Sequence, residues 1–143
     1  MKLTQISVFL ENRPGRLSAL AHSLAAAGVN LSTLMLSDNG EFGLLRLLTP
    51  DVEKAKTTIA AAGYASTTTE VVALEVPDRP GGLATVLAAV EKAGVSVEYM
   101  YAFAERPGTA AIMVFRFDDM DKALHALRAA DIGICQAVKL FER

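Results

Sequence analysis

The chain has one cysteine, no tryptophan and two histidines among its 143 residues, and these shortages exclude several kinds of protein. A single Cys135 allows no internal disulfide and offers too few thiolates for a metal site, which fits a reducing compartment. His22 and His125 lie on separate predicted helices, and no carboxylate and nucleophile surround either in a recognisable catalytic motif. Signatures of a phosphate loop or a serine elbow are also missing. The sequence therefore predicts no enzyme, no metal centre and no cofactor.

A strong net charge and a long apolar run are absent as well. The formal net charge of −2 and the isoelectric point near 5.7 give no electrostatic reason to bind nucleic acid. No apolar run is long enough to span a bilayer, and residues 1–5 lack the pattern of a secretory signal. With 52% hydrophobic residues and a mean hydropathy of +0.32, the chain can bury a sizeable core. We expect a folded, soluble, cytoplasmic protein with no membrane or nucleic-acid partner.

One six-residue stretch occurs twice, each time between an apolar run and an amphipathic segment. Residues 12–17 read Asn-Arg-Pro-Gly-Arg-Leu, and residues 78–83, which begin 66 positions later (78 − 12), read Asp-Arg-Pro-Gly-Gly-Leu. Each stretch predicts a strand-to-helix corner, with the Asn or Asp as N-cap and the proline near the first helical position. The glycine lets the backbone approach a partner closely. Unpaired N–H groups at such a helix start suit a small carboxylate or phosphate.

The surroundings of the two corners repeat too. Residues 27–30 (Ala-Gly-Val-Asn) and 93–96 (Ala-Gly-Val-Ser) keep the offset of 66, and beyond the longer second hairpin, 104–109, the best offset is 68. The element order in each half is β-α-β-β-α, so we predict a duplicated unit, with domain 1 in residues 1–68 and domain 2 in residues 69–143. The predicted strands are 3–10, 29–37, 42–49, 67–76, 95–103, 110–117 and 135–141. The predicted helices have apolar stripes at 17–24, 52–62, 83–90 and 120–130; the second begins at about Asp51, and the first three are closed by Gly28, Gly63 and Gly94.

Two complete βαββαβ units need eight strands, whereas the sequence has seven convincing ones. The run 67–76 would have to end the first unit and begin the second, so either it is split near Glu70, or the C-terminal strand 135–141 crosses over to complete the first unit. The sequence leaves open whether 67–76 is shared, split or swapped. A split near Glu70 is the preferred interpretation.

Tandem βαββαβ units with Asn/Asp-Arg-Pro-Gly-x-Leu between the first strand and the first helix resemble the ACT domain family. That family comprises small ferredoxin-like modules that bind amino acids and regulate metabolic enzymes. The resemblance covers essentially the whole chain, twice. It implies an α+β fold of two ferredoxin-like units, each with an antiparallel sheet and helices on one face. It also implies a stand-alone regulatory protein that senses a small molecule and acts in trans on a metabolic enzyme or transporter.

The resemblance further implies where a free amino acid would bind. Backbone amides of the corner would hold its carboxylate, a side-chain oxygen at the cap position its ammonium, and the start of the second strand would lie alongside. The two copies differ, because Asp78 carries a charge that Asn12 lacks and Gly82 replaces Arg16, so two equivalent sites and one asymmetric site at the domain junction both stay open. The implied residues are Asn12, Arg13, Pro14, Gly15, Arg16, Leu17, Asn30 and Leu31 in the first unit, and Asp78, Arg79, Pro80, Gly81, Gly82, Leu83, Ser96 and Val97 in the second.

An acidic cluster, formed by Asp118, Asp119 and Asp121, lies at the start of the last long predicted helix. Negative charge is favoured at that end of a helix by the helix dipole. Capping is therefore the economical interpretation of the cluster, rather than metal binding.

The corners also have a purely structural interpretation, in which they only begin helices. Apolar side chains predicted on the sheet face away from the helices (Phe9, Leu34 and Leu36) indicate pairing with a second unit or chain, and we expect a homodimer. The alternative function is accordingly a protein–protein interaction subunit without a metabolite ligand. A small ferredoxin-like enzyme is a third, disfavoured class.

Overall fold

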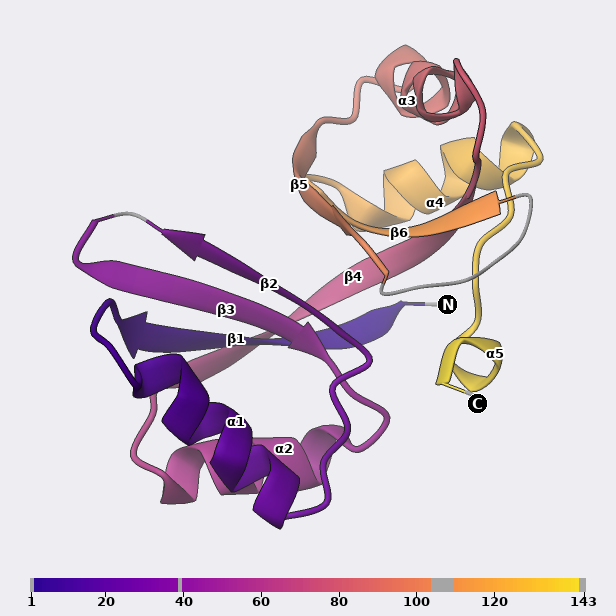
Figure 1. Ribbon diagram of the computed structural model, residues 1–143. Helices are drawn as coiled ribbons and strands as arrows, with labels where there is room; N and C mark the ends of the chain where they lie inside the picture. The colour runs from indigo at the N-terminus through magenta and orange to yellow at the C-terminus, as the bar shows by residue number, and fades with distance from the viewer. Residues whose placement is uncertain (1, 39, 104–109, 142–143) are drawn as a thin grey trace. The chain divides into compact units, whose positions relative to one another are not determined.

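The protein has an α+β fold built from two βαββαβ units. The computed structural model describes residues 2–38, 40–103 and 110–141, so the predicted second hairpin, 104–109, lies outside the described residues. The chain divides into two compact units (Figure 1). Residues 4–69 form the first unit, and residues 70–143, together with the N-terminal residues up to Leu3, form the second.

The first unit is a sheet covered on one face by two helices (Figure 1). Its strands follow the order β2-β3-β1-β4, and the pairs β1–β3 and β2–β3 are antiparallel. Alternation along β1 places Ile6 opposite Leu47 and Val8 opposite Leu45, and all four are buried under the helices. The elements are β1 (Leu3–Glu11), α1 (Arg16–Ala26), β2 (Thr33–Asp38), β3 (Phe42–Leu48), α2 (Val52–Ala61) and the start of β4 (Ser66–Pro77).

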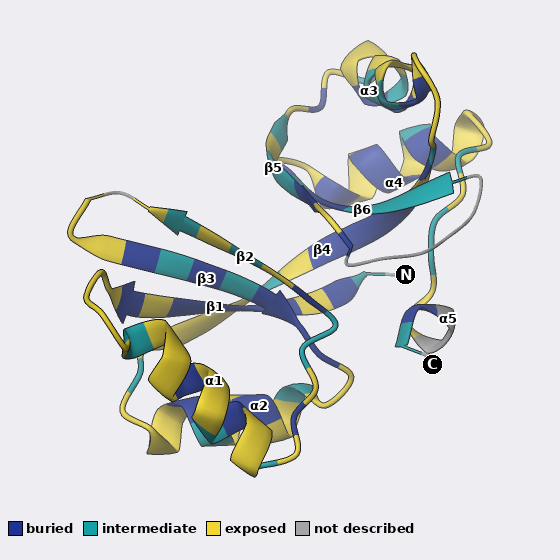
Figure 2. Ribbon diagram, in the orientation of Figure 1, coloured by how far each residue is buried: buried dark blue, intermediate teal, exposed yellow. Residues whose placement is uncertain are grey.

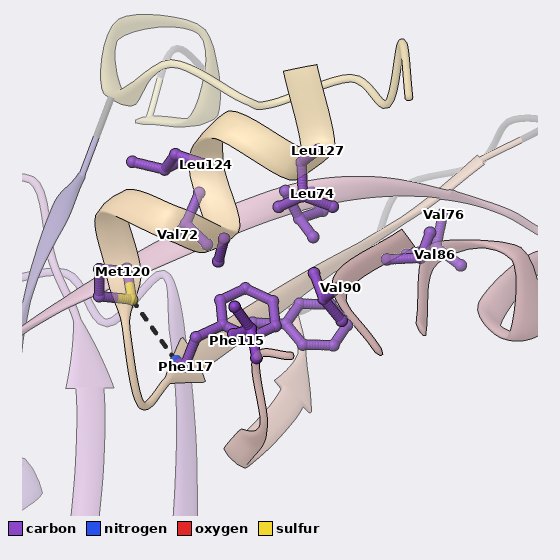
Figure 3. Packing of buried hydrophobic residues seen from close by; sticks show 12 residues of the cluster. Val72, Leu74, Val76, Val86, Val90, Phe115, Phe117, Met120, Leu124 and Leu127 are labelled. Carbon is purple, nitrogen blue, oxygen red and sulfur yellow. Dashed lines mark hydrogen bonds between the residues drawn. The ribbon is translucent and has the colours of Figure 1, made fainter. Parts of the chain in front are cut away.

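The second unit repeats this plan around its own core (Figure 3). Strands follow the order β4-β6-β5, with antiparallel pairs. The rings of Phe115 and Phe117 stack with their centroids 5.4 Å apart, and the Phe117 N–H donates to Sδ of Met120 at 3.4 Å. Both rings are fully buried. The elements after β4 are α3 (Gly82–Lys92), β5 (Val97–Ala102), β6 (Ala110–Phe117), α4 (Met120–Ala129) and α5 (Ala137–Phe141).

Strand β4 is continuous and contributes residues to both units. In strand order it neighbours β1 on one side, and residues 72–77 pair with β6 on the other. The boundary between the two units falls inside this strand, between residues 69 and 70, close to the preferred split near Glu70. The strand is nevertheless one continuous element, since threonines and valines favour extended backbone and no glycine or proline interrupts it before its last residue.

The predicted C-terminal strand 135–141 is also wrong. Among the described residues, a single isolated bridge between Ile134 and Leu74 extends the second sheet here, after which α5 begins at Ala137. A short apolar run does not by itself distinguish a strand from a buried helical turn. In this chain the helical turn buries Leu140, which is 3% exposed.

Exposed apolar side chains of the first unit lie on two faces of its sheet rather than one. Phe9, opposite Leu44, lies on the face away from the helices. The register places Leu34 opposite Leu47 and Leu36 opposite Leu45, on the helix-covered face, so their predicted position beside Phe9 is wrong. Both leucines stay about half exposed, at 44% and 49%, because β2 is the outermost strand (Figure 2).

The N-terminal residues are tied to the second unit by an ion pair. Nζ of Lys2 lies 2.9 Å from Oδ1 of Asp121, in the first turn of α4, and 3.9 Å from Oε2 of Glu70. The hydrogen bond between Lys2 and Asp121 raises the pKa of the ammonium and lowers the pKa of the carboxyl. This contact explains why the tip of the chain groups with residues 70–143.

Candidate functional site

The first predicted corner joins β1 to α1 through a left-handed glycine. Gly15 has φ 86° and is the N-cap residue, and no side chain caps the helix. Asn12, predicted to be the cap, instead donates from Nδ2 to the Gly40 carbonyl at 3.0 Å. The predictions that Asn12 caps the helix and that Pro14 lies near its first position are both wrong. The reason is the same for both, because the left-handed turn at Gly15 delays the start of the helix until Arg16.

The second corner, between β4 and α3, has the same backbone. Gly81 has φ 85°, α3 begins at Gly82, and no side chain caps it. The predicted cap at Asp78 is thus wrong for the same reason. The N–H of Arg79 donates to the Pro77 carbonyl at 3.0 Å, as that of Arg13 donates to Glu11 at 2.8 Å in the first corner.

Each corner presents backbone N–H groups for which the described residues offer no acceptor. The first regular bonds run from Ala19 to the Gly15 carbonyl and from Thr85 to the Gly81 carbonyl. Helix starts with unsatisfied amides form a ready anion site. Among the described residues, no acceptor is found for the N–H groups of Gly15, Leu17 and Ser18 in the first corner, or of Gly81, Leu83 and Ala84 in the second.

The side chains around the two corners differ. In the first corner, the Glu11 carboxylate pairs with Arg13 and also with Nη2 of Arg16, at 3.3 Å. Within the part of the chain that the structure describes, Asp78 and Arg79 of the second corner make no side-chain hydrogen bond or ion pair. The first corner thus shares one carboxylate between two guanidinium groups, while the second holds one charge of each sign that has no partner among the described residues.

The second corner is also the tighter one. Gly82 is buried, and a β-carbon added there would lie 1.9 Å from the Pro77 carbonyl oxygen. Arg16 occupies the equivalent position of the first corner with a full side chain. The start of α3 therefore packs directly on the end of β4.

The structure does not bring the second-strand residues to the corner of their own unit. Asn30 and Leu31 follow α1, whose 11 residues span roughly 16 Å from the corner at its other end. Ser96 and Val97 likewise follow α3, and the Ser96 N–H donates to Oδ1 of Asp118 at 3.0 Å. A single ligand that touches both a corner and the start of a second strand would have to take one of the two from another unit or another copy of the chain. The assignment of these four residues to a binding site stays a prediction.

Sequence reasoning missed a pocket of about 310 Å³ in the second unit. Its walls come from β4, α3, the start of β6 and the segment after α4, and they include Glu75, Pro77 and Asp131. The one signal in the sequence is Asp131, which occupies the helix-ending position filled by Gly63 in the first unit (131 − 68).

In the part of the chain that the structure describes, no group of three or more His, Cys, Asp or Glu side chains could hold a metal ion. No helix formed by the described residues is long and apolar enough to cross a membrane.

Comparison with known proteins gives a consistent family assignment. The family profile described as an ACT domain pair matches residues 1–140. The crystal structure of protein BT0572 from Bacteroides thetaiotaomicron is similar over 100% of this chain and 98% of its own, with 36% identity and a TM-score of 0.92. No functionally curated protein matches.

The regulatory subunits of aspartate kinase share the fold at low identity. The subunit from Thermus flavus has 16% identity and a TM-score of 0.63, over 90% of this chain and 92% of its own. The ligand-free subunit from Thermus thermophilus has 17% identity and a TM-score of 0.64, over 90% of this chain and 89% of its own. At these identities the likeness shows the fold alone.

Proposed function

Because the chain belongs to the ACT domain pair family, we propose that it is a regulatory protein that binds a free amino acid. The observation that carries the proposal is the repeated corner, in which the amide groups of Gly15 and Gly81 have no acceptor within the described part of the chain. A carboxylate placed there would accept several N–H bonds and face the positive end of a helix dipole. The two domains would be residues 1–68 and 69–143, and a cytoplasmic location stays a prediction.

Regulation would be exerted in trans, on a metabolic enzyme or transporter, and the chain itself would not be catalytic. This follows from the absence of a catalytic motif in the sequence and is supported by the shared fold of the aspartate kinase regulatory subunits. A ligand could shift such a partner only through different affinities for two states of the complex.

A thermal-shift screen of the twenty amino acids tests the ligand class. Ligand at a hundred times its dissociation constant should add roughly 2.7 kcal/mol of stability. Replacing Gly15 or Gly81 with asparagine should abolish the shift at a corner that binds, because the new side chain occupies the space before the amides. Asparagine tolerates the left-handed backbone, and a β-carbon at either position meets nothing within 4 Å, so both variants should fold.

Gly28→Asn is the matched control, since Gly28 also has a positive φ and open space but lies beyond the end of α1. If the ligand raises the melting temperature equally in all three variants, neither corner is the binding site. Silence of the wild-type protein across the whole panel would contradict amino-acid binding and favour the interaction subunit without a metabolite.

We also propose that the protein forms a homodimer through the outer edge of β2. Residues 33–37 of this edge strand carry no charge, no proline and no glycine, and Leu34 and Leu36 are about half exposed. Edge strands normally carry charged residues or prolines, which prevent pairing with another chain, and this segment has neither. Pairing of two copies would cover both leucines.

Replacing Leu34 with lysine should convert the dimer to a monomer in sedimentation velocity, because it places two like charges in a paired edge. Thr68→Lys is the matched control, because residue 68 is exposed and lies on β4 rather than β2, and this variant should leave the dimer intact. Dissociation by Phe9→Lys but not by Leu34→Lys would place the interface on the opposite sheet face and contradict this one.

A further inference from the structure

The pocket in the second unit is acidic and otherwise largely apolar. It measures about 310 Å³, which is a size suited to an amino acid or a small amine. Val86 and Ile132 form apolar walls. Among the described residues that line it, Glu75 and Asp131 are the charged ones, and none is a lysine, arginine or histidine. This charge pattern disfavours an anion.

The carboxylate of Glu75 lies over Gly133. A β-carbon added at Gly133 would lie 2.9 Å from Oε2 of Glu75, so the missing side chain makes room for the carboxylate. The backbone is fixed at the same point, because the Glu75 N–H donates to the Gly133 carbonyl at 2.9 Å. The first unit has Phe9 at the position equivalent to Glu75 (75 − 66), so the acid is specific to the second unit.

Asp131 contributes the second carboxylate from a left-handed backbone, with φ 61°. It ends α4 as Gly63 ends α2, and in each case the next residue donates to a carbonyl of the last helical turns. Glycine adopts this conformation at less cost than aspartate. In the described ranges 2–38, 40–103 and 110–141, neither Glu75 nor Asp131 has a side-chain hydrogen bond or ion pair.

We propose that this pocket binds a small organic cation that carries a primary ammonium group on a short apolar stem. The ammonium donates to the carboxylates of Glu75 and Asp131, and the stem lies against Val86 and Ile132. Two carboxylates are too few ligands to hold a bare calcium ion, and the apolar walls suit a carbon chain. The ammonium can belong to a free amine or to the side chain of a basic amino acid. This site is separate from the two corners and does not depend on them.

Titration calorimetry with 1,4-diaminobutane, L-lysine and L-norleucine tests the proposal. The diamine and lysine present a terminal ammonium, whereas norleucine presents a methyl group of similar length. We expect the diamine to bind and norleucine to be rejected by this pocket. Because the carboxylates are solvent-exposed, we expect millimolar or somewhat tighter binding that weakens with added salt. Lysine binding together with the diamine would identify a basic side chain as a second source.

Variants assign the binding to the pocket. Glu75→Gln and Asp131→Asn keep the size of each side chain, and each should weaken diamine binding by about tenfold, since a charge-assisted hydrogen bond is lost. Glu91→Gln removes the same charge from an exposed position of α3 outside the pocket and should have no effect. Circular dichroism confirms that each variant is folded.

Three outcomes would overturn the proposal. The first is no diamine binding by the wild-type protein at millimolar concentration. The second is unchanged affinity in the double variant Glu75→Gln/Asp131→Asn. The third is loss of diamine binding in Gly81→Asn, which would move the site to the corner. A failure of amino acids to bind at the corners would not affect the result, because the diamine has no carboxylate.

Discussion

Replacing Gly82 with alanine is expected to lower the free energy of unfolding by about 3 kcal/mol. The added β-carbon would meet the Pro77 carbonyl oxygen at 1.9 Å and its carbon at 2.9 Å. Both atoms are backbone at the end of β4, so the clash can be relieved only by moving α3 away from the strand. Urea denaturation of the variant and the wild-type protein measures the difference.

Two substitutions serve as controls for this effect. Gly81→Ala puts a β-carbon into open space at φ 85° and should cost only about 1–2 kcal/mol, the price of the left-handed backbone. Arg16→Ala, at the equivalent position of the first corner, removes an exposed ion pair and should cost less than about 1 kcal/mol. If Gly82→Ala lowers the free energy of unfolding no more than Gly81→Ala does, the second corner is not closely packed.

The sequence predicted the order and type of the elements well, because apolar periodicity reports directly on burial. The capping interpretation of the acidic cluster is confirmed for Asp119, whose Oδ1 accepts from the Lys122 N–H at 3.1 Å. Asp118 instead accepts from the Ser96 N–H, and Asp121 pairs with Lys2. At the corners the same logic gave the wrong cap, because a left-handed glycine starts the helix without a side chain. Residue type alone does not distinguish these two ways of beginning a helix.

Features that depend on pairing between distant segments could not be predicted. The face on which Leu34 lies depends on the register between β2 and β3, and an error of one residue moves a side chain to the other face. Likewise, Glu75 and Asp131 are far apart in sequence, and only the contact of residues 133–135 with β4 brings them into one pocket. Corner amides, by contrast, are a local feature and were predictable from the repeated motif.

The two corners show how a duplicated unit can keep its backbone while its chemistry changes. Both have a left-handed glycine and the same turn hydrogen bonds. The second corner has Pro77 where the first has Glu11, and Gly82 where the first has Arg16. The ion pairs of the first corner are therefore missing from the second, and the start of α3 packs directly on the end of β4. A free amino acid carries an α-ammonium and an α-carboxylate. We therefore expect it to prefer the second corner, where Asp78 and Arg79 are not paired with each other or with other described residues.

Replacing Phe115 with alanine is expected to cost about 3–5 kcal/mol, because a fully buried ring that stacks on Phe117 leaves a cavity. Ile59→Ala should cost about 2–5 kcal/mol in the same way in the first unit. The two residues belong to separate core clusters with no shared member. Their effects in the double variant should therefore add to within about 0.5 kcal/mol in urea denaturation. A loss below about 1 kcal/mol in Phe115→Ala would contradict its place in the core. A double-variant loss far from the sum would instead show that the shared strand β4 couples the two cores.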